Sequence, residues 1–192
     1  TVALIRESMR HATRTVLGAA LSDAQLMANV GIPLAKQMAV FSAEHADELV
    51  TAYRAHNAEV HDRLIAEYDG VEEVLAGLLA DGVPLGVVTS KSRAVARRGI
   101  DHFDLGRYFE VLVCSDDVTE HKPDPHPLLV AAHEIGLPIE KCMYIGDSPH
   151  DMSAAIQAEA VSVAALWGAF PARQVPEPGP EFALPSIKAL PD

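Results

Sequence analysis

The sequence has little of what marks several large classes of protein. Its 192 residues include two cysteines, 5% aromatic residues and no apolar run close to the roughly 20 residues of a membrane-spanning helix. Cys114 and Cys142 lie in apolar, strand-like stretches, which predicts buried thiols rather than a disulfide framework or a zinc site. No charged-then-apolar signal segment opens the chain. We therefore expect a cytoplasmic protein with no membrane partner.

Positive charge is also scarce. The formal net charge is −12, which argues against a nucleic-acid partner. An acidic chain repels anionic substrates too, so a phosphate site here needs local positive charge or a metal ion. No Gly-x-Gly-x-x-Gly follows an apolar run and no Gly-x-x-x-x-Gly-Lys occurs, so a nucleotide-binding oxidoreductase is disfavoured. The sequence leaves the oligomeric state open.

The first 68 residues have the pattern of helices alone. Apolar residues recur at helical spacing over 2–17, and Ser22 is placed to cap a helix that reaches about Val30. Gly31-Ile32-Pro33 ends that segment, and further helices are expected over 34–41 and 43–68. This stretch predicts an all-helical module.

After Asp69-Gly70 the pattern changes to alternating strands and helices. Short apolar runs over 84–89, 110–115, 142–145 and 161–166 alternate with helical segments over 71–80, 92–102, 125–135 and 149–159. A Pro-rich loop is expected over 171–180, followed by a short edge strand and a helical turn in 181–192. Such alternation predicts an α/β fold with a doubly wound parallel sheet, here as a core domain over 69–192.

Two acidic residues follow the apolar run that ends at Gly146. A strand, a tight turn and a helix N-terminus would hold Asp147 and Asp151 at one end of a parallel sheet, where open α/β folds bind ligands. Two carboxylates suit Mg²⁺, which keeps several waters and works on phosphates. Helix capping explains the same residues without a metal, since Ser148 fits the N-cap and Asp151 completes a capping box.

Three further polar residues belong to the same predicted sheet edge. Thr89 and Ser90 close one strand, where a hydroxyl beside a helix N-terminus can meet a phosphate oxygen. Lys122 precedes Pro123, which restricts its reach and suits a fixed positive charge. The alternatives are that Ser90 only caps a helix and that Lys122 is a solvated loop residue.

The long helix expected over 43–68 carries another polar group. Asn57 and His61 lie four residues apart and share a face, with His56 beside them. They are candidates for substrate contacts together with Gly31. A solvated or interhelical polar face is the alternative.

The hydroxyl residues, the lysine and the acidic pair are more specific together, in this order along the chain, than any of them alone. Their arrangement resembles that of the haloacid dehalogenase superfamily of phosphohydrolases. Thr89 with the apolar run before it resembles that family's second motif, Lys122-Pro123-Asp124 the third, and Gly146-Asp147-Ser148-Pro149-His150-Asp151 the fourth. Residues 1–68 resemble a small helical cap inserted in a Rossmann-like core. The likeness is to phosphoglycolate phosphatases and a related inorganic pyrophosphatase branch. Features of the pyrophosphatase branch are seen in 53–57, 61–62 and 115–118.

The resemblance implies Mg²⁺-dependent hydrolysis of a small phosphorylated substrate through an aspartyl-phosphate. It implies that Asp147 binds Mg²⁺, while Asp151 ligates the ion or orients its waters. Thr89 and Lys122 would hold the transferring phosphoryl oxygens, and the helical module would close over the site. The exact substrate stays open, since phosphoglycolate, pyrophosphate and sugar phosphates all fit.

One part of the family pattern is missing. No Asp-x-Asp-Gly-Thr occurs, although its leading aspartate is the family's nucleophile and its strand is central to the sheet. Without that strand, two rows of backbone groups would lack partners. We expect that residues 1–192 are a portion of a longer protein; a rearranged sheet or completion by a neighbouring chain is the alternative.

Two other functions compete with phosphate hydrolysis. The absent nucleophile favours a catalytically inactive binding or regulatory module. A haloacid dehalogenase is the other alternative, but its chemistry needs no metal and the acidic pair counts against it. A smaller departure is Glu159, where the family commonly has Gly, which predicts a different turn geometry.

Overall fold

The computed structural model describes residues 1–19, 21–168 and 179–190. The chain divides into two compact units, Thr1–Ala66 and Glu67–Asp192, close to the boundary predicted at residue 68. The Pro-rich loop predicted over 171–180 lies outside the described residues as far as 178. No helix in the described part of the chain is long and apolar enough to cross a membrane.

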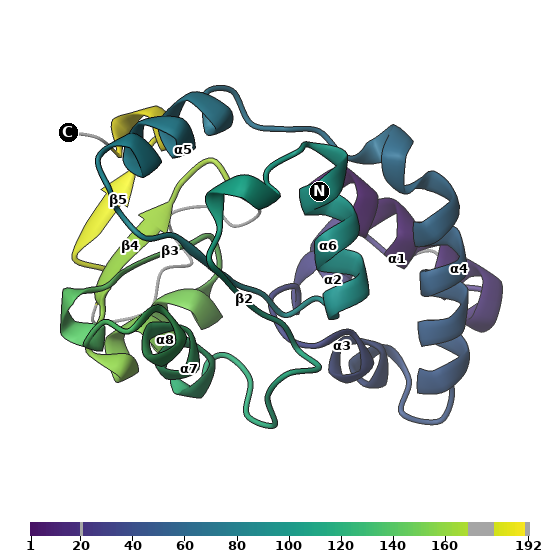
Figure 1. Ribbon diagram of the computed structural model, residues 1–192. Coiled ribbons are helices and arrows are strands. Elements are labelled where there is room, and N and C mark those ends of the chain that lie inside the picture. The colour runs from purple at the N-terminus through teal and green to yellow at the C-terminus, as the bar shows by residue number, and fades with distance from the viewer. Residues whose placement is uncertain (20, 169–178, 191–192) are drawn as a thin grey trace. The chain divides into compact units, whose positions relative to one another are not determined.

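The first unit is helical throughout its regular structure (Figure 1). Its elements are α1 (Val2–Leu17), α2 (Asp23–Met27), α3 (Leu34–Phe41) and α4 (Ala46–Leu64). A fully formed capping box joins Ser22 to Gln25 at the start of α2. Helix α2 stops at Met27, short of Val30, and Gly31 follows with a positive φ of 113°. The buried core of this unit is formed by Met9, Ala12, Leu26, Met38 and Leu49.

The second unit alternates helices and strands, which confirms the predicted α/β class. Its elements are α5 (Val71–Ala80), β1 (Gly86–Val88), α6 (Arg93–His102), η1 (Gly106–Tyr108), β2 (Val111–Val113), α7 (His126–Ile135), η2 (Ile139–Lys141), β3 (Met143–Gly146), α8 (Pro149–Ala158), β4 (Val161–Ala165), β5 (Phe182–Leu184) and η4 (Ile187–Ala189). All its described strand pairs are parallel. The strand and turn predicted for the tail are present as β5 and η4.

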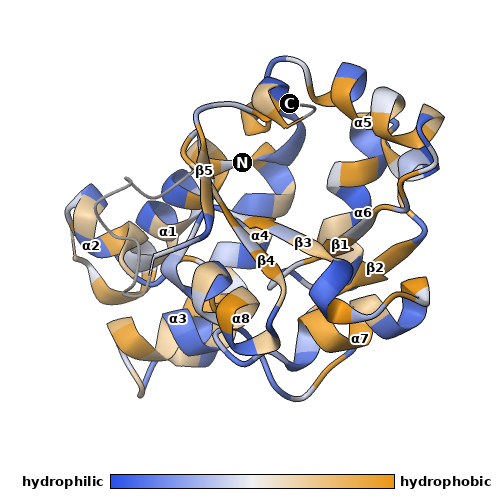
Figure 2. Ribbon diagram, turned by 90° about the vertical axis from the view of Figure 1, so that its left-hand side faces the viewer, coloured by the Kyte–Doolittle hydropathy of each residue, from blue (hydrophilic) through white to orange (hydrophobic). Residues whose placement is uncertain are grey.

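Helices cover the strands of this unit on both sides. Helices α7 and α8 lie together on one face, and α5 lies across the strands from them (Figures 1 and 2). The hydrophobic colouring in Figure 2 is strong along the strands, as expected for parallel strands buried between helices. On the α7–α8 side, Leu128, Ala154, Ala155 and Ala158 form a buried cluster with Ala160. The small alanines of α8 allow this helix to approach the sheet closely.

The strands form two separate sheets rather than one. Strands β1 and β2 pair with each other, and β3, β4 and β5 form a second sheet. Strand β4 has neighbours on both sides and is almost wholly buried, whereas β1 and β3 have one neighbour each and are half-exposed. Met143 of β3, for example, is 51% exposed. Among the described residues, no backbone pairing joins β1 or β2 to β3, β4 or β5.

Two detailed expectations are corrected by the structure. Cys114 is buried as predicted, but Cys142 is only half-buried, because it lies between η2 and β3. The different turn geometry predicted at Glu159 is wrong. Glu159 takes the left-handed conformation, with φ 63° and ψ 25°, and its N–H bonds to the carbonyls of Ala155 and Ile156. The helix-ending geometry is therefore the one that glycine would adopt.

Candidate active site

The acidic pair lies where β3 ends and α8 begins. Ser148 is the N-cap of α8, and a reciprocal capping box joins it to Asp151. The Ser148 amide lies 3.0 Å from Asp151 Oδ2, and the Asp151 amide lies 3.2 Å from Ser148 Oγ. A Cβ added to Gly146 would lie 2.3 Å from Asp151 Cβ, so only glycine permits this close approach. The capping role expected for Asp151 is therefore real.

Asp151 also belongs to a buried ion pair. Its Oδ1 atom lies 2.6 Å from Lys122 Nζ, and both side chains are only 8% exposed. The Tyr144 hydroxyl lies 2.9 Å from Lys122 Nζ and 3.1 Å from the same Asp151 oxygen. Lys122 is therefore not a solvated loop lysine. It is fixed by a carboxylate and a phenol at the carboxyl end of the sheet.

This pairing sets the charge states of both partners. Burial raises the pKa of Asp151, but Lys122 and the hydrogen bonds to the carboxylate outweigh it, and the net pKa is lowered. Burial lowers the pKa of Lys122, but Tyr144 and Asp151 outweigh it, and the net pKa is raised. The site therefore holds a charged carboxylate and a charged ammonium side by side at neutral pH.

The Asp151 carboxylate has little capacity left for a metal ion. Oδ1 accepts from Lys122 and lies against the Tyr144 hydroxyl, while Oδ2 accepts from the Ser148 amide and hydroxyl. A carboxylate offers about four lone-pair sites. The donors of Lys122 and Ser148 take three of them, and the Tyr144 hydroxyl crowds Oδ1 as well. The arrangement favours the expectation that Asp151 orients neighbouring groups over the expectation that it ligates a metal directly.

Asp147 lies at the same end of β3, in a tightly confined position. A Cβ added to Gly168, in the turn after β4, would lie 2.0 Å from Asp147 Cβ and 2.3 Å from its Oδ2. The Asp147 charge also raises the pKa of Tyr68, after the larger effect of burial. The carboxylate is thus packed between the ends of β3 and β4, where Gly168 leaves room for it.

Thr89 and Ser90 lie in the turn between β1 and α6, with Lys91 beside them. The Thr89 amide bonds to the Val113 carbonyl of β2, and the Lys91 amide donates to Thr89 Oγ1 at 3.2 Å. The charges of Asp147, Lys122 and Asp151 all act on Lys91. The structure therefore brings Asp147, Asp151 and Lys122 within electrostatic reach of the turn that holds Thr89.

The candidate substrate-contact residues of the helical unit make contacts within that unit. Asn57 is buried, and its amide donates to Ser8 Oγ at 3.3 Å. His56 stacks on His11 with ring centroids 4.2 Å apart, and His61 Nδ1 lies 2.7 Å from Asp62 Oδ1. These contacts fit the interhelical alternative for Asn57 and His56. Gly31 follows α2 and has the positive φ already described.

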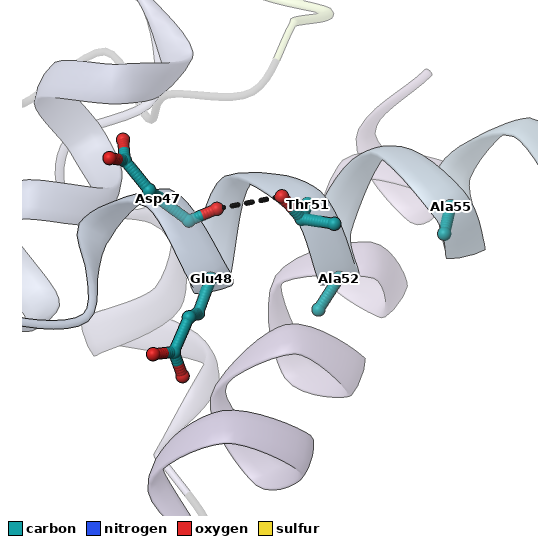
Figure 3. Close-up of a pocket in the computed structure, with 5 residues that line it drawn as sticks. All are labelled: Asp47, Glu48, Thr51, Ala52 and Ala55. Atoms are coloured by element: carbon teal, nitrogen blue, oxygen red, sulfur yellow. Dashed lines mark hydrogen bonds between the residues drawn. The ribbon is translucent and has the colours of Figure 1, made fainter.

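Two other places in the described residues have features of a binding site but do not suit a phosphate. A hollow along α4 is lined by Asp47, Glu48, Thr51, Ala52 and Ala55, and its two charged residues are both acidic (Figure 3). The ligand atoms of Cys114, Asp116 and Asp117 lie within 4.8 Å of one another. However, Arg93 binds both carboxylates, and burial raises the pKa of the Cys114 thiol to about 11.

Sequence reasoning missed two residues of the site. Tyr144 lies in the apolar run that predicted β3, and its hydroxyl gave no sequence signal beyond the polar tip of an aromatic residue. Lys91 follows the predicted Thr89-Ser90 pair directly, so its charge at a strand end could have been noticed. The Tyr144 hydroxyl contacts Lys122 directly, and the charge of Lys122 acts on Lys91.

The fold and this cluster define an α/β protein with a charged site at the ends of parallel strands. A family model described as haloacid dehalogenase-like hydrolase matches residues 1–165. A relative from Caldanaerobacter subterraneus is 35% identical over 187 residues, 97% of this chain and 85% of the relative. It carries the name PpaX, as does a Bacillus velezensis relative described as a pyrophosphatase, 33% identical over 161 residues, 84% of this chain and 74% of the relative. The chain belongs to the haloacid dehalogenase-like hydrolases.

Solved structures agree on the fold. A hydrolase from Pseudomonas syringae has a TM-score of 0.85 at 24% identity, covering 97% of this chain and 88% of that one. A predicted phosphoglycolate phosphatase from Haemophilus somnus has a TM-score of 0.80 at 22% identity, covering 98% of this chain and 90% of that one. The Rossmann-like α/β fold expected from the sequence is confirmed.

Proposed function

We propose that this hydrolase cleaves a small phosphate ester or anhydride with Mg²⁺, through an aspartyl-phosphate in the intact protein. The observation that carries the proposal is the buried Lys122–Asp151 pair beside Asp147, at the end of β3. A chain with a net charge of −12 needs local positive charge to bind a phosphate. The buried ammonium of Lys122 supplies it.

The donors at this site fit Mg²⁺. Asp147 offers a carboxylate held in place by the close packing against Gly168. Among the described residues, the one group of three metal-ligating side chains with ligand atoms within 4.8 Å of one another is Cys114, Asp116 and Asp117, and Asp147 is not part of it. Mg²⁺ suits such a site, since it usually takes one or two carboxylates and completes its shell with water and substrate phosphate. Bound there, the ion would neutralise negative charge on the phosphoryl group.

Each residue of the site would then have a separate role in binding and catalysis. Lys122 would bind a phosphoryl oxygen and stabilise the charge that develops on it, and Thr89 would donate from its hydroxyl. Asp151 would hold Lys122 and the N-terminus of α8 in position through the contacts described above. Backbone amides near Ser90 would add to the anion site.

We propose that Thr1–Ala66 is the helical cap, with Gly31, His56, Asn57 and His61 as candidate substrate contacts.

The names of the relatives support a choice of substrate class. The curated relatives that share the name PpaX favour pyrophosphate, and the structural neighbours include a predicted phosphoglycolate phosphatase. Both compounds are small phosphorylated anions. We propose pyrophosphate first and a phosphoglycolate-like ester second.

The decisive test is hydrolysis by the full-length protein. Pyrophosphate, phosphoglycolate and sugar phosphates would be supplied with Mg²⁺ and, separately, with a chelator. We expect phosphate release with Mg²⁺ and none in chelator, and we expect Asp147→Asn to lose at least about 100-fold in kcat. Full activity in chelator would overturn the metal assignment. Asp104→Asn, an exposed position on the loop after α6, is the matched control.

A second candidate function is a catalytically inactive binding module. It is favoured by one observation, the lack of an Asp-x-Asp-Gly-Thr segment anywhere in residues 1–192. This candidate predicts that the protein binds phosphate and Mg²⁺ but releases no product from any phosphorylated compound. Halide release from a haloacid in chelator would instead support a dehalogenase.

A further inference from the structure

Arg93 is the first residue of α6 and joins this helix to the end of β2. Its Nε lies 3.1 Å from Asp117 Oδ1 and its Nη2 lies 2.6 Å from Asp117 Oδ2, so the guanidinium donates to both oxygens of one carboxylate. Nη2 also donates to the Leu112 carbonyl at 2.7 Å, and the Arg93 amide donates to Asp116 Oδ1 at 2.8 Å. The side chain and the backbone of Arg93 are therefore both bonded to the segment that contains β2.

The partners of Arg93 are themselves fixed by the backbone. Asp117 Oδ2 accepts from the amide of the buried Cys114 at 2.7 Å, and Leu112 pairs with Val87 in the β1–β2 sheet. An exposed ion pair contributes little when both side chains are free to move. Arg93 and Asp117 are only partly exposed, at 38% and 29%, and pairing through two parallel hydrogen bonds fixes their relative orientation. The contact therefore sets where α6 begins relative to β2.

The turn before Arg93 carries groups that we propose to bind the phosphoryl group. At its start, the Thr89 amide donates to the Val113 carbonyl at 2.9 Å. Farther along, the Lys91 carbonyl accepts from the Ser115 amide at 3.0 Å. These two bonds hold the turn at the β1 side, and Arg93 holds it at the α6 side. Without the Arg93 side chain, the turn would lose its bonds at one of its two ends.

We propose that Arg93 is a positioning residue, which holds the turn between β1 and α6 so that the Thr89 hydroxyl is in place to donate to the transferring phosphoryl group. This inference rests on the proposed function and makes it more specific. Direct binding of the substrate by Arg93 is the alternative. It is disfavoured because the guanidinium already donates to the Asp117 carboxylate and the Leu112 carbonyl, and the carboxylate offsets its charge.

The first test measures kcat and KM of the full-length protein with Mg²⁺, on the faster of pyrophosphate and phosphoglycolate. We expect Arg93→Met to lower kcat by about 10- to 100-fold and to change KM by less than about threefold, since small displacements in an active site have effects of this size on the chemical step. An unchanged kcat would overturn the inference.

Arg107→Met is the matched control. Arg107 also pairs with carboxylates, those of Glu72 and Asp104, and its side chain is 44% exposed. It precedes β2, however, whereas Asp116 and Asp117 follow that strand. We expect Arg107→Met to change kcat by less than about twofold, because it removes only exposed ion pairs.

Arg93→Lys separates geometry from charge. Lysine keeps the positive charge but lacks the planar group that donates to both carboxylate oxygens. We expect kcat of Arg93→Lys to stay within about threefold of that of Arg93→Met. A larger recovery would mean that positive charge alone is needed, and the positioning role would be overturned.

A double variant tests whether Arg93 acts through the turn that holds Thr89. The effects of independent residues multiply, whereas those of residues coupled through a backbone shift do not. We expect the combination of Thr89→Ala and Arg93→Met to lose no more than about threefold in kcat beyond Thr89→Ala alone. A larger further loss would show that Arg93 acts independently of this turn, which overturns the inference.

Binding gives a readout that does not depend on turnover. Orthophosphate would be titrated calorimetrically, with Mg²⁺, into the unaltered protein and Arg93→Met. We expect the two Kd values to agree within about threefold, because an interaction made in the transition state affects kcat rather than ground-state binding. A loss of affinity as large as the loss in kcat would mean that Arg93 binds the anion itself, and would overturn the inference.

The remaining outcomes are distinguishable. Thermal unfolding verifies that each variant is folded. If Arg93→Met is unfolded at the assay temperature, Asp117→Asn replaces it in the kinetic and binding comparisons, with the same expected direction, because it weakens the same pair. If the unaltered protein hydrolyses neither compound, the proposed function is overturned and the inference falls with it. If it is active and the variants fail these expectations, only the inference is overturned.

Discussion

At the scale of single residues, one phenol connects most of the active-site cluster. The Tyr144 hydroxyl lies within 3.3 Å of Lys122, Asp151 and the carbonyl of Val88. Val88 belongs to β1 and Tyr144 to β3, so this hydroxyl joins two sheets that share no backbone pairing. Its removal should therefore affect both stability and catalysis.

We predict that Tyr144→Phe lowers the free energy of unfolding by about 1–3 kcal/mol, because buried polar groups lose a partner. Catalysis should fall more modestly, about 10-fold in kcat, since Lys122 and Asp151 still pair with each other. Chemical denaturation and steady-state kinetics measure the two effects. Tyr108→Phe is a suitable control, because the partners of that hydroxyl, Arg107 and Glu72, are exposed. Equal losses in the two variants would contradict a special role for Tyr144.

Residue types alone were enough to predict some residues of the site but not their contacts. Asp147, Asp151, Thr89 and Lys122 could be selected from the sequence because each follows an apolar run or a helix-start signal. Their partners could not, because contacts such as Tyr144 with Val88 join residues 56 positions apart. Such a contact depends on the packing of β3 beside β1, which local patterns do not encode. Whether these side chains act in catalysis stays a prediction.

At the scale of elements, the sequence predicted helices and strands well because capping and turn signals bound them. Helix α1 spans Val2–Leu17 and α5 spans Val71–Ala80, as the periodicity indicated. Helix α4 was predicted too long, over 43–68, and spans Ala46–Leu64. Residues 43–45 and 65–68 continue the helical pattern of the sequence without joining the helix, so periodicity alone could not place its limits.

The turn after α8 offers a test at this scale. Glu159 has a left-handed backbone, which costs about 1–2 kcal/mol for a residue with a Cβ. We predict that Glu159→Gly raises the free energy of unfolding by about 0.5–1 kcal/mol, the net of relieved strain and the greater freedom of glycine in the unfolded chain. Equilibrium denaturation measures the change.

The matched control is the equivalent turn after α7. Gly136 ends that helix with φ 80°, and Gly136→Ala should destabilise the protein by about 1 kcal/mol. If Glu159→Gly and Gly136→Ala shifted stability in the same direction, the backbone conformation would not be the cause.

The turn after β4 should matter for the chemistry. A Cβ at Gly168 would overlap Asp147, whose side chain must then move. We predict that Gly168→Ala lowers kcat by about 100-fold, as displacements of about 1 Å in an active site commonly do. Gly99→Ala, in α6, is the control, since a Cβ there meets nothing within 4 Å. Unchanged kinetics and Mg²⁺ affinity in Gly168→Ala would show that Asp147 is not positioned by this contact.

At the scale of the whole molecule, the sequence predicted the α/β class and the helical stretch before it. It predicted a continuous parallel sheet less well, because pairing between strands is a long-range property. The split between β1 and β3 leaves Met143 half-exposed, and β1 and β3 less buried than β4. Stability should therefore depend on ligands that tie the ends of β1 and β3 together.

We predict that Mg²⁺ with phosphate stabilises the folded chain measurably. A ligand at about 100 times its Kd adds about 2.7 kcal/mol to the free energy of unfolding. For a protein of this size, that corresponds to a rise in Tm of roughly 5–10 °C. Differential scanning calorimetry, with Mg²⁺ and phosphate added separately and together, measures the shift. The combination should exceed either alone, since the metal and Lys122 would share one anion.

Two variants make the result specific to the site. Asp147→Asn should abolish the Mg²⁺-dependent part of the shift, because the amide is neutral and a far weaker ligand for a hard cation. Asp104→Asn removes an equal charge from an exposed loop and should preserve it. An equal shift in both variants would mean that the ions act through general screening of the net charge of −12, with no metal held at the end of β3.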